Sequence, residues 1–138
     1  MIIVIDSNVL ISALIRDSLT RRIIIGSGMN FVFPEISLNE IRKHEKLIRE
    51  KSGLTENELD RLLVRILDYI VLVPIEVIKE HLSEAKSIML DIDPKDVVFI
   101  AAALSFEDSI IWSDDKDFDE QDRIKVVKTK HFAKLFEK

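Results

Sequence analysis

The sequence has 138 residues, of which 47% are hydrophobic and 33% are charged, and its formal net charge is −5 at pH 7. These values exclude a disordered chain and fit one domain over residues 1–138, while the negative charge argues against a general nucleic-acid coat. The chain has no cysteine and no apolar run of the roughly 18 residues that a membrane span needs, so thiolate chemistry is excluded, and we expect a cytoplasmic protein without membrane attachment.

The chain opens with a short β-branched run from Ile2 to Ile5 that contains no polar residue. A run of this kind is typical of a strand covered on both faces, as in a parallel sheet flanked by helices. Asp6 follows directly, and apolar residues then recur at helical spacing between positions 9 and 14. A carboxylate is therefore expected at the carboxyl end of a buried strand, where open α/β sheets bind their ligands.

Helix-like and strand-like segments alternate along the rest of the chain. Helices are expected at 18–25, at 36–51, at 55–68 after a capping-box pattern, around 77–85, at 97–104 and at 131–136. Further strands are expected at 31–33, 70–73, 110–112 and 125–127. This alternation predicts a three-layer α/β/α sandwich with a central, mostly parallel five-stranded sheet.

Acidic residues fall where this topology places strand ends and helix starts. Asp6 ends the first strand, and Asp115 and Asp117 follow the fourth, so neighbouring strands would bring them to one sheet edge. Asp96 opens one helix, and Glu40 lies in another. Packed carboxylates repel one another unless a cation neutralises them, and a set of oxygen ligands alone suits Mg²⁺ or Mn²⁺. The sequence therefore predicts a divalent-metal site that handles phosphates.

Each acid also has an ordinary structural interpretation. Asp6 can cap the helix that follows it, and the stretch 93–96 resembles a capped helix start. Glu40 alone would be a solvated helix acid, and the acids around Asp115 could form a surface loop. The metal interpretation is favoured because these explanations would have to hold together at four separate places.

Four pieces of sequence lie in order along nearly the whole chain: DSN at 6–8, Glu40, DPKDVVFIAAAL at 93–104 and IIWSDDKDF at 110–118. Together they resemble the PIN-domain family of metal-dependent ribonucleases, in which VapC-type toxins are numerous. The resemblance implies a PIN-like fold and an intact acidic site. Asp93 lies close enough to Asp96 to leave open which of the two is the site acid.

The resemblance also implies the role of each matching position. It assigns catalysis to Asp6, Glu40, Asp96 and Asp115, metal binding to Asp6, Asp96, Asp115 and Asp117, and support to Asn8 and Ser113. One or two divalent ions would lower the pKa of a water for in-line attack on an RNA phosphodiester. The two support residues suit hydrogen bonds to water or phosphate. A homodimer is also implied and, if the protein is the toxin of a type II toxin-antitoxin pair, a small antitoxin protein as partner.

Basic residues give a weaker indication of where RNA binds. Candidate phosphate contacts form two groups, Arg16, Arg21 and Arg22 near the first helix and Arg42, Lys43, Lys46, Arg49 and Lys51 on the helix at 36–51. Either group could flank the acidic site, although a solvated helix face is the simpler explanation. The three histidines, His44, His81 and His131, have no pairing motif and are expected at the surface.

Two other classes of function remain open. One is a PIN-like module that binds RNA without cutting it, and the other is a different magnesium-dependent α/β protein that handles phosphates. A phosphatase of the haloacid dehalogenase type would carry Asp at the position of Asn8, and a receiver domain would carry an acceptor Asp after the third strand, where this chain has Pro74-Ile75-Glu76. Both versions of the second class fit worse.

Overall fold

The computed structural model of the protein describes the backbone of residues 1–136 and the side chains of residues 1–134. The last two residues of the predicted domain at 1–138 lie outside the described residues. One five-stranded sheet, with strand order β3-β2-β1-β4-β5, forms the centre, and all of its neighbouring pairs are parallel. The strands are β1 (Ile2–Ile5), β2 (Asn30–Pro34), β3 (Ile70–Val73), β4 (Ser109–Trp112) and β5 (Val126–Val127).

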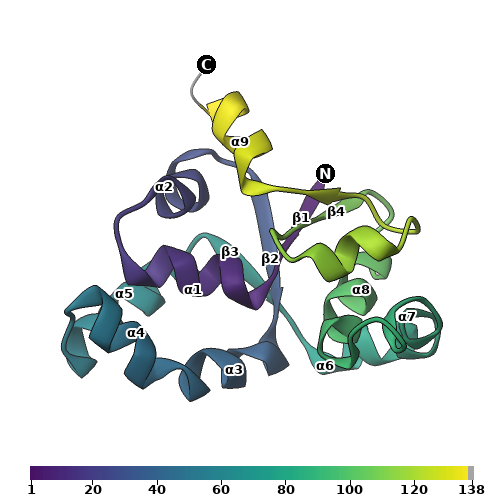
Figure 1. The fold of residues 1–138 in the computed structure, drawn as a ribbon, viewed down its shortest axis with the longest axis horizontal. Coiled ribbons are helices and arrows are strands. Elements are labelled where there is room, and N and C mark those ends of the chain that lie inside the picture. Colours follow the sequence, from purple (N-terminus) through teal and green to yellow (C-terminus); the bar gives the residue numbers. More distant parts are fainter. Residues whose placement is uncertain (137–138) are drawn as a thin grey trace.

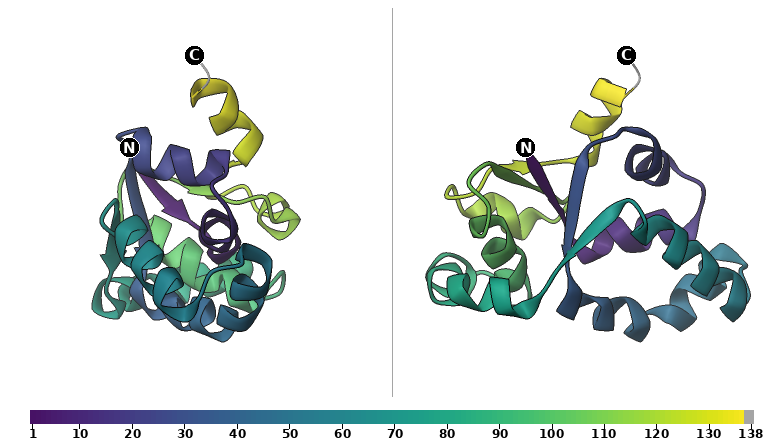
Figure 2. Two further views of the ribbon diagram at one scale, coloured as in Figure 1. Left: turned by 90° about the vertical axis from the view of Figure 1, so that its left-hand side faces the viewer. Right: turned by 180° about the vertical axis from the view of Figure 1, so that it is seen from behind.

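Helices cover both faces of this sheet, which confirms the three-layer α/β/α prediction (Figures 1 and 2). In Figure 1, α1, α2, α4 and α5 lie to the left of the sheet and α6, α7 and α8 to the right. The helices are α1 (Ser7–Ile15), α2 (Leu19–Gly26), α3 (Leu38–Lys43), α4 (Glu45–Ser52), α5 (Glu56–Leu67), α6 (Ile75–Ile78), α7 (Leu82–Met89), α8 (Val97–Leu104) and α9 (Thr129–Phe136). Short 3-10 turns are η1 (Glu35–Ser37), η2 (Lys79–His81), η3 (Pro94–Asp96) and η4 (Lys116–Glu120). No described helix is long and apolar enough to cross a membrane.

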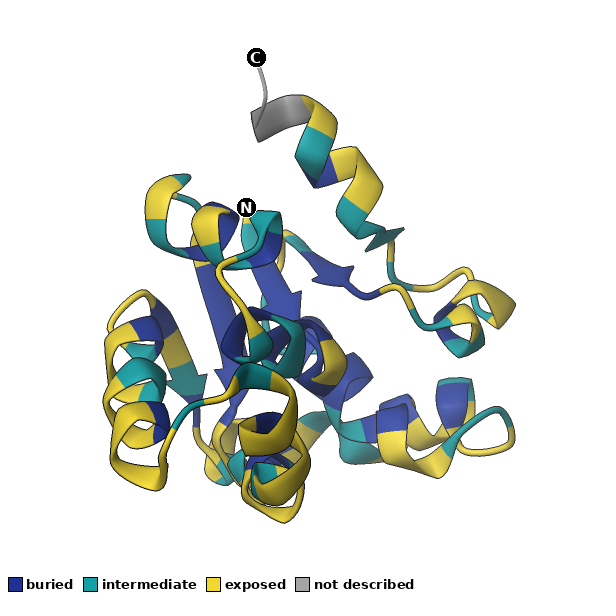
Figure 3. Ribbon diagram, turned by 60° about the vertical axis from the view of Figure 1, so that its left-hand side comes forward, coloured by how far each residue is buried: buried dark blue, intermediate teal, exposed yellow. Residues whose placement is uncertain are grey.

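The central strand and its neighbours are buried, as a strand covered on both faces requires (Figure 3). Helix α8 packs across β1, β2 and β4, and its small side chains, such as Ala101 and Ala103, are fully buried against them. Trp112 fills the space beside β5, with its ring centroid 5.8 Å from that of Phe31 and 4.6 Å from that of Phe132. This dense packing holds the ends of β1 and β4 in one fixed position.

The single helix predicted at 36–51 is wrong, because the chain turns at His44 and makes two helices, α3 and α4. The backbone N–H of His44 donates to the carbonyl oxygen of Glu40 at 3.2 Å, and its ring Nδ1 bonds to the same oxygen at 2.8 Å. Since a carbonyl only accepts, Nδ1–H is the donor. These bonds stabilise a turn without glycine or proline.

Helix α5 begins with the capping box that the sequence predicts. Thr55 Oγ1 accepts from the backbone N–H of Glu58 at 3.2 Å, and the Glu58 carboxylate accepts from the Thr55 N–H at 3.0 Å. Leu59 and Ile66 on this helix are buried in the core. Gly53 ends α4 with φ 75°, a left-handed conformation that costs glycine little, and so allows the sharp entry into α5.

Candidate active site

The sheet register brings two polar residues together at the carboxyl ends of β1 and β4. Ile5 pairs with Trp112, so the next residues, Asp6 and Ser113, lie side by side. The backbone N–H of Asp6 donates to the Trp112 carbonyl at 3.2 Å and extends the pairing by one step. The pairing of β1 with β4 therefore places the Asp6 carboxylate and the Ser113 hydroxyl next to each other at the carboxyl edge of the sheet.

Asp6 caps a helix and also lines the site. One oxygen, Oδ1, accepts from the backbone N–H of Val9 at 2.8 Å at the start of α1, and the other accepts from the Ser113 hydroxyl. The side chain is 4% exposed, and this burial is the main reason that its pKa is raised. The bonds from Ser113 and Val9 oppose the rise, while the nearby charge of Asp115 adds to it.

Ser113 is fully buried, so it does not face the solvent side where a water or phosphate would enter. Its hydroxyl donates to Asp6 and accepts from the backbone N–H of Asp115 at 3.0 Å. It therefore acts by positioning two acids relative to each other. Asn8, the other predicted support residue, is exposed and lines the hollow that these acids share.

Four carboxylates converge beside this pair from two distant segments. One oxygen of each lies within 4.8 Å of the others, and the four residues are Asp93, Asp96, Asp115 and Asp117. Asp93 caps η3 by accepting from the Lys95 N–H at 3.0 Å, and Asp115 caps η4 by accepting from the Asp117 N–H at 2.9 Å. The capped start that the sequence suggested at 93–96 is thus present, and the cap by Asp115 was not predicted.

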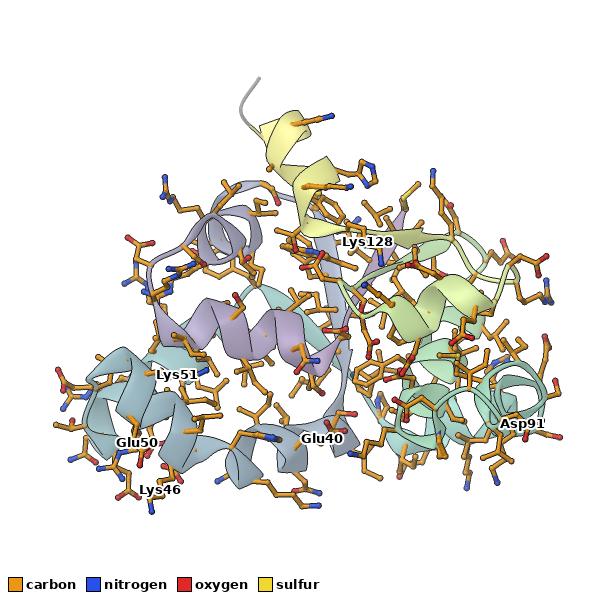
Figure 4. The ribbon with its side chains drawn as sticks, in the orientation of Figure 1. Glu40, Lys46, Glu50, Lys51, Asp91 and Lys128 are labelled. Atoms are coloured by element: carbon orange, nitrogen blue, oxygen red, sulfur yellow. The ribbon has the colours of Figure 1, made fainter. Side chains whose placement is uncertain are left out.

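A hollow of about 240 Å³ contains all four predicted catalytic acids. Its lining includes Asp6, Ser7, Asn8, Glu40, His44, Asp93, Lys95, Asp96, Phe99 and Asp115. Figure 4 shows Glu40 rising from α3 toward the start of α1. Of the predicted metal ligands, Asp96, Asp115 and Asp117 belong to the tight cluster, whereas Asp6 lines the wall of the hollow and Asp93 completes the cluster. Asp93 and Asp96 both belong to this cluster.

Electrostatics show that the cluster favours a bound cation. Burial, followed by the charges of Asp93, Asp115, Asp6 and Asp117, raises the pKa of Asp96 to about 7. The Asp115 carboxylate is the main cause of the raised pKa of Asp117. Within the described residues, Asp96 Oδ2 is buried and has no hydrogen-bond partner. A buried oxygen without a partner, surrounded by carboxylates, fits a hard divalent cation such as Mg²⁺ or Mn²⁺.

Four residues that line the hollow were absent from the predicted site: Ser7, His44, Lys95 and Phe99. His44 is exposed, as expected, yet it also faces the acids because it lies one turn after Glu40. Lys95 lies between the cluster acids Asp93 and Asp96 in the sequence, and this position could have identified it as a site residue.

The basic residues proposed as phosphate contacts lie outside this hollow. Arg16 lines a different cleft at the far end of α1, and Arg42 lines a small cavity with Leu14 and Ile41. Lys43 is exposed on α3, and Figure 4 shows Lys46 on α4, well apart from Glu40. Neither basic group therefore lines the acid hollow itself.

Comparison with known proteins gives one family. No curated protein matches the chain. The family model for the PIN domain matches residues 4–132, a range that includes all four clustered acids as well as Asp6 and Glu40. The chain therefore belongs to the PIN-domain family, whose members are generally metal-dependent nucleases.

Proposed function

We propose that the protein is a metal-dependent endoribonuclease that hydrolyses RNA phosphodiester bonds at the acid hollow. The observation that carries this proposal is the approach of four carboxylate oxygens to within 4.8 Å of one another. Asp6 and Glu40 line the hollow beside them, so six acids from across the chain serve one site. Membership of a family of nucleases supports the same conclusion.

The residues that would hold the cation are Asp93, Asp96, Asp115 and Asp117. When bound, Mg²⁺ or Mn²⁺ at such a site supplies a water of lowered pKa and neutralises charge on the phosphodiester. Glu40 accepts the proton of the attacking water at a carboxylate oxygen. The Asn8 amide and the Lys95 ammonium group bind phosphate oxygens, and Asp6, fixed by its two hydrogen bonds, orients the water.

Cleavage of RNA by matched variants tests this proposal. Asp96→Asn and Asp6→Asn each remove one charge from the hollow, whereas Asp91→Asn removes the same charge from an exposed turn outside it, labelled in Figure 4. With Mg²⁺ or Mn²⁺, we expect the wild type and Asp91→Asn to cut total RNA at the same rate. The cleavage rate of Asp96→Asn and of Asp6→Asn should be at least about 100-fold lower, and a chelator should stop all cleavage. Equal cleavage by all four preparations would reveal a contaminating nuclease and contradict the proposal.

The same proteins separate an enzyme from a module that only binds RNA. We expect Asp96→Asn to keep its affinity for RNA while losing cleavage, because the removed charge opposes phosphate binding. Binding by the wild type without cleavage in either metal would identify the non-catalytic module instead. A parallel reaction with single-stranded DNA of the same base composition establishes the preference for RNA.

The proposal extends to partners and location. We propose a cytoplasmic homodimer that acts as the toxin of a type II toxin-antitoxin pair. Val64, Tyr69 and Val71 are 63%, 46% and 66% exposed near the edge strand β3, which supports a further protein contact. Sedimentation should give twice the chain mass, and a small protein encoded beside this one should suppress cleavage when added. A monomer at all concentrations, or cleavage unaffected by that protein, would contradict these parts.

A further inference from the structure

Five arginines line two adjoining clefts at the opposite end of α1 from the acid hollow. One cleft, of about 450 Å³, lies between the end of α1 and α5, and the other, of about 380 Å³, lies between α2 and α5. The two share Arg21 and Arg65 along their common wall and together form one arginine cleft. Its basic residues are Arg16, Arg21, Arg22, Arg61 and Arg65.

The charge in this cleft is strongly positive although the whole chain carries −5. The acids that line it are Asp17 and Glu58, and the Glu58 carboxylate already accepts from the Thr55 N–H at 3.0 Å. Among the side chains of residues 1–134, none of the five guanidinium groups forms an ion pair. Burial first, and also the charge of Arg65, lowers the pKa of Arg21, whereas Asp17 raises it. The cleft is therefore short of negative charge.

One of these guanidinium groups is anchored by hydrogen bonds, and two others project from one face of α5. Arg21 Nε donates to the Ala13 carbonyl at 2.7 Å and Nη2 to the Leu14 carbonyl at 3.5 Å, which anchors this side chain on the end of α1. Arg61 and Arg65 are one turn apart on α5 and so face the same way. Planar guanidinium groups bind phosphate oxygens through paired N–H donors, so several of them along one cleft suit a phosphate chain.

A third, polar hollow adjoins the acid hollow along α1. This hollow, of about 420 Å³, shares Asn8 and Asp115 with the acid hollow and is also lined by Ser12 and Thr20. Asn8 and Ser12 are four residues apart on α1, which runs horizontally in Figure 1, and Arg16 follows directly after the last residue of this helix. This helix is about 14 Å long at its usual rise per residue, a distance that a short nucleic-acid strand can span.

We propose that the arginine cleft binds backbone phosphates of the same RNA strand whose scissile bond lies in the acid hollow. This inference rests on the proposed ribonuclease function and adds a second, separate contact with the substrate. An acidic segment of a protein would also meet positive charge here. RNA is favoured because the third hollow shares Asn8 and Asp115 with the acid hollow and is also lined by Thr20, the residue directly before Arg21 of the cleft.

Binding to RNA by charge-matched variants tests the cleft. Arg61→Gln/Arg65→Gln removes two exposed charges from α5, and Lys79→Gln/Lys86→Gln removes two exposed charges from the region of η2 and α7, on the other side of the sheet. Both pairs are made in the Asp6→Asn protein to prevent cleavage. Anisotropy of a labelled single-stranded RNA of about 12 nucleotides then gives the affinity as a function of salt.

We expect Arg61→Gln/Arg65→Gln to weaken RNA binding about tenfold. It should also reduce the slope of the logarithm of affinity against the logarithm of salt concentration by about 1.4 in magnitude, because each lost phosphate contact on a single strand contributes about 0.7. The lysine pair should match the parent. Arg61→Lys/Arg65→Lys keeps both charges and should retain the slope, which separates loss of charge from loss of structure. If the Arg61→Gln/Arg65→Gln variant binds RNA with the same affinity and salt dependence as the Lys79→Gln/Lys86→Gln variant, the proposed RNA contact at the arginine cleft is wrong.

Two further outcomes distinguish this inference from its foundation. A glutamate-rich peptide that binds the parent more tightly than RNA does, and loses that binding in the arginine pair, would overturn the assignment to RNA. If the wild type fails to cut RNA while Arg61→Gln/Arg65→Gln still weakens RNA binding, the proposed ribonuclease function is contradicted. The proposed RNA contact at the arginine cleft is then still supported.

Discussion

The environment of Asp96 makes the stability of the protein depend on pH. Its carboxyl group is buried, has an oxygen without a partner in the described structure, and has a pKa raised to about 7. Because this value lies above the ordinary 3.8, the folded, metal-free protein binds a proton that the unfolded chain releases. The resulting stability is fully present below pH 3.8 and is lost as the pH rises through about 7.

Removing this charge should therefore stabilise the metal-free protein in a pH-dependent way. We expect Asp96→Asn to raise the free energy of unfolding at pH 8 by an amount on the order of 1 kcal/mol after solvent screening, and to change it little at pH 5, where Asp96 is protonated. Urea unfolding in the presence of a chelator measures both values. Asp91→Asn, on an exposed residue, serves as the control. The same change at both pH values would contradict the raised pKa.

The hydrogen bonds of the Ser113 hydroxyl can be tested by a single substitution. Ser113→Ala removes the donor to the buried Asp6 carboxylate and the acceptor of the Asp115 N–H. We expect a loss of about 1–3 kcal/mol in the free energy of unfolding, because groups that were hydrogen-bonded inside the protein lose their partner. The exposed Ser87, whose hydroxyl bonds to a carbonyl in its own helix, provides the control Ser87→Ala. Equal effects of the two substitutions in urea unfolding would show that Ser113 has no special positioning role.

Individual elements were predictable where local sequence determines them. The β-branched run of β1 and the capping box of α5 are both present as expected, because strand burial and capping leave signals in adjacent residues. The turn at His44 was missed because a side chain bonding to the backbone replaces the usual glycine or proline. The segment predicted around 77–85 divides in the same way, into α6, η2 and α7.

The capping box of α5 can be tested without touching the site. Thr55→Ala removes the oxygen that accepts from Glu58, and we expect it to lower the free energy of unfolding by about 1 kcal/mol. Thr55→Ser keeps that oxygen and should restore most of the loss. Thermal or urea unfolding of the two variants measures the difference. If serine and alanine are equally destabilising, the cap contributes nothing and only the lost methyl group matters.

For the whole molecule, strand order determined which acids could meet. Sequence reasoning brought Asp6, Glu40, Asp96 and Asp115 to one place because parallel strands end at one edge, and the hollow contains all four. The tight cluster depends on side-chain directions at η3 and η4, so the joint presence of Asp93 and Asp96 could not be read from spacing. Arg16 lines a cleft at the other end of α1 from the acids, and this separation could not be read from its position in the sequence.

Cation binding should make the stability of the whole protein depend on metal and pH together. We expect saturating Mn²⁺ to raise the melting temperature more at pH 8 than at pH 6, because protons compete for the Asp96 carboxylate below about pH 7. At a free concentration of about 100 times the dissociation constant, the gain at pH 8 is about 2.7 kcal/mol. Differential scanning calorimetry with and without Mn²⁺ measures it. A metal effect of equal size at both pH values would place the ion away from Asp96.

Diffraction from crystals grown with Mn²⁺ and recorded near the manganese absorption edge would locate the ion itself. We expect an anomalous peak bounded by the carboxylates of Asp93, Asp96, Asp115 and Asp117, and its disappearance in Asp96→Asn crystals grown in the same way. Crystals of the wild type at saturating Mn²⁺ that show no peak among these carboxylates would contradict the divalent-cation site and, with it, the proposed ribonuclease.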